Sequence, residues 1–220
     1  MKILKEKKVC AICGKEEEYM NLYSNFVSGM PDLDLKPNGS MASLGIEIQM
    51  CPHCGYCNYD ISEAVQDRFE NKRNNPLELW KEYSNVQEIL KSNKNESLKK
   101  YLVMAEQYRG NLQNDLAYNM LVKASWVADT EEESKELMKE ALSIFEEDIL
   151  PQIRGQLFQV ADIARQCQCF EQSKLILEAC KNIIDQEHDD AKDLEKILKF
   201  QTKLIKNKDS KRHNMSEIED

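Results

Sequence analysis

The chain of 220 residues is acidic and polar, with a formal net charge of −9, 31% charged residues and a mean hydropathy of −0.63. The negative net charge argues against a nucleic-acid coat protein. No apolar run approaches the length of a transmembrane helix, which argues against a membrane protein. The first residues are charged where a secretory signal would be apolar, so we expect a cytoplasmic protein with reduced thiols.

The N-terminal quarter of the chain reads as a small β module. Residues 1–8 are predicted to be a solvated, basic lead-in to a Cys-x-x-Cys-Gly turn at 10–14. Apolar and polar residues alternate over 20–26 and again over 46–50, the pattern of half-buried strands. The second strand runs directly into another Cys-x-x-Cys-Gly turn at 51–55.

Two such turns predict a closed metal site. Two intervening residues let both sulfurs of a turn reach one ion, while the glycine allows the backbone to wrap beneath it. Paired turns of this kind form a zinc ribbon, so we expect one structural Zn²⁺ rather than four reduced core cysteines. The predicted ligands are Cys10, Cys13, Cys51 and Cys54. The two turns already complete a closed site. If one of these four cysteines were not a ligand, His53 or Cys57 would be the alternative.

Other chemistry at these cysteines is disfavoured. The sequence Cys51-Pro52-His53-Cys54 is similar to the active site of a thioredoxin-type oxidoreductase, but Gly55 follows at once and no βαβ pattern is present. A zinc deaminase would show His-x-Glu ahead of Pro-Cys-x-x-Cys, and this chain does not. The sequence leaves open any role for Cys57 or for three later cysteines, which we interpret as packing residues: Cys167, Cys169 and Cys180.

A loop over residues 28–45 separates the two strands and contains several prolines and glycines. Loops of this length without periodicity are usually functional or disordered. Its central segment, residues 31–37, is interpreted first as an edge strand between prolines. The alternative is a partner-contacting loop that uses Asp32, Asp34 and Lys36.

From Asp60 onward the apolar period changes from 2 to 3.6, which indicates helices. Asp60 with Glu63 forms a predicted capping box, and Asn75-Pro76 marks a second helix start. Further helices are predicted over about 98–110, 116–127, 130–145, 151–164, 171–186 and 190–207. We therefore expect a mostly α fold with three parts: a zinc ribbon over 1–60, a helical domain over 61–207 and a polar, flexible tail over 208–220.

The order of small and bulky residues over 157–180 resembles a tetratricopeptide repeat. Short turns between the predicted helices favour an antiparallel array. The match lacks the usual Gly, Tyr and final Pro of that repeat, so we describe the predicted domain as repeat-like.

Taken together, the Cys-x-x-Cys-Gly turn at 10–14, the Asp-Leu-Asp loop, the Cys-Pro-x-Cys-Gly-Tyr segment at 51–56 and the helical remainder resemble an uncharacterised bacterial domain-of-unknown-function family. That family combines a zinc-ribbon-like N-terminus with tetratricopeptide-like helices. The resemblance implies this fold and these metal ligands, and it implies no substrate.

We interpret the protein as a zinc-binding protein-protein interaction module or scaffold rather than an enzyme. Its acidic helical body predicts a partner rich in Lys or Arg. The first alternative is a nucleic-acid-associated regulatory protein that uses Lys2, Lys5, Lys7 and Lys8 together with basic residues of the C-terminal tail. The second is an enzyme with a site in the long loop. No membrane association is expected, and the sequence gives no oligomeric state or pathway.

Overall fold

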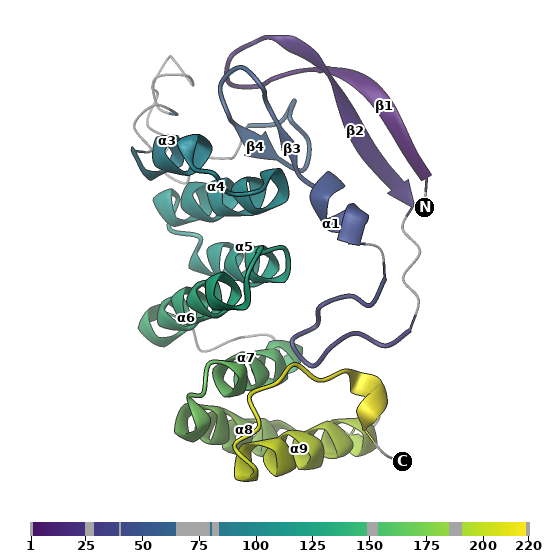
Figure 1. Cartoon of the computed structure of the whole chain (residues 1–220), viewed down its shortest axis with the longest axis vertical. Helices are drawn as coiled ribbons and strands as arrows, with labels where there is room; N and C mark the ends of the chain where they lie inside the picture. The colour runs from purple at the N-terminus through teal and green to yellow at the C-terminus, as the bar shows by residue number, and fades with distance from the viewer. Residues whose placement is uncertain are drawn as a thin grey trace. The chain divides into compact units, whose positions relative to one another are not determined.

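The computed structural model describes residues 2–24, 29–39, 41–64, 80, 84–148, 154–184 and 191–218. It is mostly helical, with a small β region near the N-terminus (Figure 1). Its contacts divide the chain into an N-terminal unit, Met1–Phe26 with Ser40–Leu137, and a C-terminal unit, Val27–Gly39 with Met138–Asp220. This grouping differs from the predicted division at residue 60, because the β region shares contacts with the first helices.

A long β hairpin begins the N-terminal unit. Strand β1 (Lys2–Val9) pairs antiparallel with β2 (Glu16–Ser24), and the first cysteine turn connects them. The predicted strand over 20–26 overlaps β2. The segment over residues 1–8, predicted as a solvated lead-in, has no buried residue among 2–8, but it forms a regular strand that was not predicted. Lysines of β1 face glutamates of β2, as in the Lys5–Glu18 pair at 3.1 Å. Such cross-strand pairs favour the strand in a segment without apolar alternation.

The second cysteine turn lies in a smaller ribbon. Helix α1 (Met41–Ile46) precedes β3 (Gln49–Met50), which pairs antiparallel with β4 (Cys57–Asn58). The strand predicted over 46–50 is therefore confirmed only in its last two residues. The side chain of Gln49 fixes the ribbon to the following turn, because its carbonyl oxygen accepts a hydrogen bond from the Ile61 amide at 3.0 Å.

Among the described residues, the N-terminal unit continues with four helices: α3 (Ser84–Lys91), α4 (Glu96–Gly110), α5 (Asn114–Trp126) and the first part of α6 (Glu131–Asp148). The helices predicted near 98–110 and 116–127 are confirmed. Asn95 caps α4 by accepting from the Leu98 amide at 2.8 Å, and the hydroxyl of Thr130 caps α6 by accepting from the Glu133 amide at 3.1 Å. The helix starts predicted at Asn75-Pro76 and Pro151 lie outside the described residues.

The C-terminal unit contains the rest of α6, then α7 (Arg154–Gln166), α8 (Phe170–Ile184), α9 (Ala191–Lys206) and a short 3₁₀ turn, η1 (Met215–Glu217). Helices α7 and α8 form a hairpin in which the Ser173 hydroxyl donates to the Ala161 carbonyl at 2.6 Å. The small residues of the repeat-like pattern are buried at this contact. The tetratricopeptide-like arrangement itself stays a prediction. No helix among the described residues has the length and apolar character needed to cross a membrane.

Three helices end on a non-glycine residue with left-handed backbone. Leu112 (φ 55°), Gln168 (φ 65°) and Lys208 (φ 52°) follow α4, α7 and α9. At each of these helix ends, the amide of the residue after the left-handed one donates to the carbonyl five residues earlier, as in the 2.8 Å bond from the Gln113 amide to the Tyr108 carbonyl. These paired bonds form Schellman motifs, in which glycine is the usual left-handed residue.

Candidate metal centre

The two cysteine turns adopt the same backbone conformation. In each turn the glycine amide donates to the carbonyl of the first cysteine at 2.9 Å, from Gly14 to Cys10 and from Gly55 to Cys51. Both glycines have positive φ, 70° and 74°, where a side chain would be strained. The Cys-x-x-Cys-Gly pattern therefore specifies a tight turn that brings its two thiols together.

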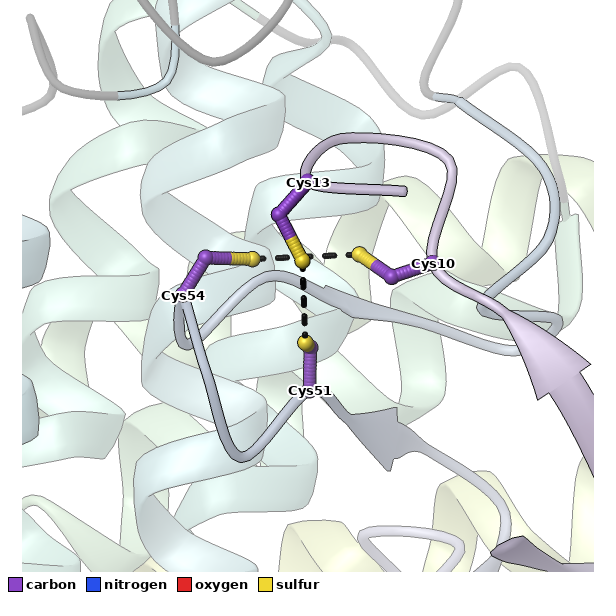
Figure 2. Close-up of side chains that lie close together, drawn as sticks. All are labelled: Cys10, Cys13, Cys51 and Cys54. Atoms are coloured by element: carbon purple, nitrogen blue, oxygen red, sulfur yellow. Dashed lines mark hydrogen bonds between the residues drawn. The ribbon is translucent and has the colours of Figure 1, made fainter. Parts of the chain in front are cut away.

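The four predicted ligands converge from these turns (Figure 2). The sulfur atoms of Cys10, Cys13, Cys51 and Cys54 all lie within 4.8 Å of one another. The Cys10–Cys54 sulfur distance is 3.8 Å and the Cys13–Cys51 distance is 3.6 Å. A tetrahedral ion with metal–sulfur bonds of about 2.3 Å requires sulfur separations of about 3.8 Å. The cluster is therefore of the right size to hold a metal ion.

Backbone amides of each turn point at the first cysteine sulfur of that turn. Burial by itself raises the pKa of Cys51, but amides of His53 and Cys54 and the neighbouring thiols together lower it to about 7. Burial likewise raises the pKa of Cys10, against amides of Cys13 and Ile12 that lower it. Amides at equivalent positions thus favour the thiolate form, which is the form that binds metals.

Side chains outside the cysteine motifs surround the cluster. The Trp80 indole nitrogen donates to the Cys54 carbonyl at 2.7 Å, and its ring meets that of Tyr56 edge-on at 5.4 Å. Tyr19 of β2 is buried, and this burial with the neighbouring Cys51 raises its pKa. Neither Trp80 nor Tyr19 was predicted at the site, because neither residue carries a sequence signal for a place beside the ligands.

His53 and Cys57 lie outside the cluster. The His53 ring bonds Glu17 through Nε2 at 2.8 Å and lies 3.4 Å from the Lys15 ammonium through Nδ1. Cys57 is fully buried, and its thiol donates to the Gly55 carbonyl at 3.6 Å. Cys167, Cys169 and Cys180 are not part of any metal-sized cluster among the described residues.

The predicted partner-contacting loop makes internal contacts in the C-terminal unit. Asp34 is fully buried and accepts from Arg212 at 3.0–3.1 Å, while its carbonyl accepts from Gln159 at 2.8 Å. Asp32 accepts from the Asn214 amide group at 3.1 Å, and burial lowers the pKa of Lys36. Asp34 is therefore not available to a partner. The edge strand is also absent here, where the structure has only an isolated bridge between Asp32 and Asn214.

The segment after α9 is held by a buried arginine. Arg165 of α7 has no exposed side-chain area and donates to Asp162 at 2.6 Å. It also donates to the carbonyls of Asp209 and Lys211, at 2.6 and 2.8 Å. The backbone of Asp209 and Lys211 is thus bonded to α7, in a segment that was predicted to be a flexible tail.

Three of the four N-terminal lysines proposed for nucleic-acid binding are in ion pairs. Lys5 pairs with Glu18 at 3.1 Å, Lys7 approaches Glu16 at 4.0 Å, and Lys8 pairs with Asp60 at 2.9 Å. A phosphate would have to compete with these carboxylates.

No protein-family model, curated protein or solved structure matches this chain. The resemblance to an uncharacterised bacterial family therefore stays a prediction. What the structure establishes by itself is a mostly helical protein with four cysteines placed to bind a metal ion.

Proposed function

We propose that the protein binds one structural zinc ion through Cys10, Cys13, Cys51 and Cys54 and acts as a protein-protein interaction module. The spacing of the four sulfurs carries the zinc proposal, because it matches a tetrahedral ion. Zinc commonly takes four thiolates in structural sites. A complete set of four protein ligands leaves no position for a reactive water, which favours a structural role over a catalytic one.

The zinc ion would join the two cysteine turns, which come from separate β ribbons. The smaller ribbon has only two residues in each strand, too few to stabilise it by burial alone. Binding of a structural zinc supplies on the order of 10 kcal/mol or more to folding. The bond from Trp80 to the Cys54 carbonyl would connect the second cysteine turn to the helical part of the N-terminal unit, and the bond from the Ala11 amide to the Ile61 carbonyl would connect the first turn to the segment that follows β4.

The contacts of the described residues favour an interaction role over the two alternatives. Nucleic-acid binding is disfavoured by the ion pairs of the N-terminal lysines and by the net charge of −9. An enzyme site in the long loop is disfavoured because Arg212 already engages Asp34. The hydrogen bond from the Ser173 hydroxyl of α8 to the Ala161 carbonyl of α7 supports a repeat-like hairpin, and stacked hairpins of this kind commonly present binding surfaces. A cytoplasmic location, where thiols stay reduced, suits the zinc site.

The zinc proposal is tested by metal analysis of two matched variants. Purified wild-type protein should contain about one zinc per chain, and Cys51→Ser should lose it. Cys57→Ser is the control, because Cys57 lies three residues from Cys54 but outside the cluster. Wild-type protein without metal and with a protease-resistant N-terminal unit would contradict the proposal, as would equal zinc retention by both variants.

A further inference from the structure

Helices α8 and α9 lie side by side in the C-terminal unit (Figure 1). Their side chains leave a groove between the two helices. The groove has a volume of about 200 Å³. One stripe of each helix lines it: Lys174, Leu177, Glu178 and Lys181 from α8, and Leu198, Thr202, Ile205 and Lys206 from α9.

The floor of the groove is apolar. Leu177 is buried, and Leu198 and Ile205 are partly covered. The hydroxyl of Thr202 donates to the Leu198 carbonyl at 2.7 Å, so this polar group is already satisfied within its own helix. Among the described residues of α9, only Gln201 and Leu204 are buried, so much of its apolar side is incompletely covered.

The rim of the groove is basic. Lys174, Lys181 and Lys206 are exposed and face a single acidic residue, Glu178, which gives the lining a net charge of +2 (three lysines less one glutamate). Among the described residues, these three ammonium groups form no ion pair. The local charge is thus opposite to the net charge of −9, and opposite to what the acidic composition predicted for a partner-binding groove. A positive rim favours an anionic partner.

We propose that this groove binds an acidic amphipathic helix of a partner protein, an inference that rests on the proposed interaction role. Small-molecule sites usually have volumes of about 300–1,000 Å³, so the groove is small for a ligand of that kind. It suits a few apolar side chains from one face of a helix, at spacings i, i+3 or i+4. Asp or Glu residues that flank this apolar face would meet the three lysines.

Two other occupants fit the groove less well. A second copy of this chain, bound about a two-fold axis, would bring one lysine rim against the other, which like-charge repulsion disfavours. An anionic lipid surface would need protruding apolar side chains, whereas Leu177 on the groove floor is 4% exposed.

The test starts from a display library of helical peptides of about 16 residues, the length of α9, in which only the charge and the apolar pattern vary. The bait is the zinc-loaded full chain. Enriched peptides should share apolar residues on one face and flanking Asp or Glu. The consensus peptide is then titrated by fluorescence anisotropy, together with a scrambled version of the same composition that has no apolar face.

Two double variants locate the binding surface. Lys174→Glu with Lys206→Glu reverses the rim and should weaken binding by about tenfold or more. Lys192→Glu with Lys203→Glu makes the same net-charge change at exposed residues of α9 that do not line the groove, and should change affinity less than about threefold. Circular dichroism and melting of both variants check that the fold is retained.

Each other outcome overturns a defined part of the inference. Enriched peptides that bind both double variants equally would place the interaction elsewhere and leave the interaction role standing. No enrichment, or enrichment of basic or patternless peptides, would overturn the groove proposal, and no enrichment at all would also remove support for the interaction role. Self-association lost only in the rim variant would assign the groove to a second copy. Binding to vesicles of anionic but not neutral lipid, lost in the same variant, would assign it to a membrane surface.

Discussion

Gly55 lies against the side chain of Leu90, so that a Cβ atom at position 55 would be 2.2 Å from Leu90 Cδ1 and 3.1 Å from its Cγ. The second cysteine turn therefore needs glycine for two reasons, its positive φ and its closeness to α3. Gly14, at the equivalent position of the first turn, also has positive φ, but a Cβ atom there would have no neighbouring atom within 4 Å. The equivalent turns differ in what surrounds them.

This difference predicts unequal effects of the same substitution. Gly14→Ala should cost only the backbone strain, about 1–2 kcal/mol of unfolding free energy. Gly55→Ala should cost about 1–3 kcal/mol more, because the Leu90 side chain must turn away. Chemical denaturation of the zinc-loaded variants measures both values. Equal losses would show that Leu90 repacks freely around the added methyl group.

Removal of the metal should change the fluorescence of Trp80. Its indole is 3% exposed and bonds the Cys54 carbonyl, so loss of the turn should expose the ring and shift its emission to the red. Trp126, the other tryptophan, lies in α5 and has no contact with the cysteine turns in the described structure. Chelation should therefore shift the emission of Trp126→Phe protein but not that of Trp80→Phe protein. A shift in the Trp80→Phe protein but not in the Trp126→Phe protein would contradict the placement of Trp80.

Leu112→Gly should stabilise the protein. Leu112 ends α4 with φ 55° and is 61% exposed, so the substitution removes backbone strain and loses little burial. Relief of about 1–2 kcal/mol of strain, less the greater flexibility of glycine in the unfolded chain, leaves a gain of about 0.5–1 kcal/mol. Leu112→Ala, which keeps the strained backbone, is the control in urea denaturation and should give no gain. A destabilised glycine variant would mean that the Leu112 side chain contributes contacts worth more than the strain.

Asp162 predicts a pH dependence of stability in the acid range. Burial raises its pKa to about 6, since the opposing effect of Arg165 is smaller. Between about pH 4 and pH 6 the folded protein keeps a proton that the unfolded chain has released, so this group makes stability fall as pH rises. The loss should approach about 3 kcal/mol by pH 7 and should be absent in Asp162→Asn. The difference in unfolding free energy between wild type and this variant, measured from about pH 4 to 7, checks the slope.

Asp193→Asn is the control for this measurement, because the Asp193 carboxylate is 85% exposed and its ion pair with Lys196 is long, at 3.9 Å. The difference in unfolding free energy between wild type and Asp193→Asn should be nearly constant with pH. A wild-type stability that instead rises with pH over the same range, relative to Asp162→Asn, would show that pairing with Arg165 outweighs burial.

The features predicted correctly from sequence are those whose cause is local. The two cysteine turns depend on five consecutive residues each, and both form with the expected glycine conformation. Helices α4, α5, α8 and α9 follow from apolar periodicity, and α6 has its Thr130 cap at the start of the helix predicted over 130–145. Each of these signals is contained in a short stretch of consecutive residues.

The features that were missed depend on distant residues or on pairing. Strand β1 has no apolar alternation, and its partner β2 supplies the hydrogen bonds and the opposite charges. Asp34 looked like a loop carboxylate because Arg212, which buries it, lies 178 residues away. The α8–α9 groove depends on how two helices pack, which the apolar pattern of either helix does not determine.

The membership of residues 27–39 in the C-terminal unit has a consequence for the order in which the chain folds during synthesis. The last metal ligand, Cys54, is translated 44 residues after Cys10, whereas Asp34 must wait 178 residues for Arg212. At about 5–20 residues per second, these intervals are roughly 2–9 s and 9–36 s. A nascent chain that has captured its metal therefore holds residues 27–39 inside a closed ring while the Asp34 carboxylate is still in water. All four cysteines are thus translated well before Arg212, the residue that buries the carboxylate inside this ring.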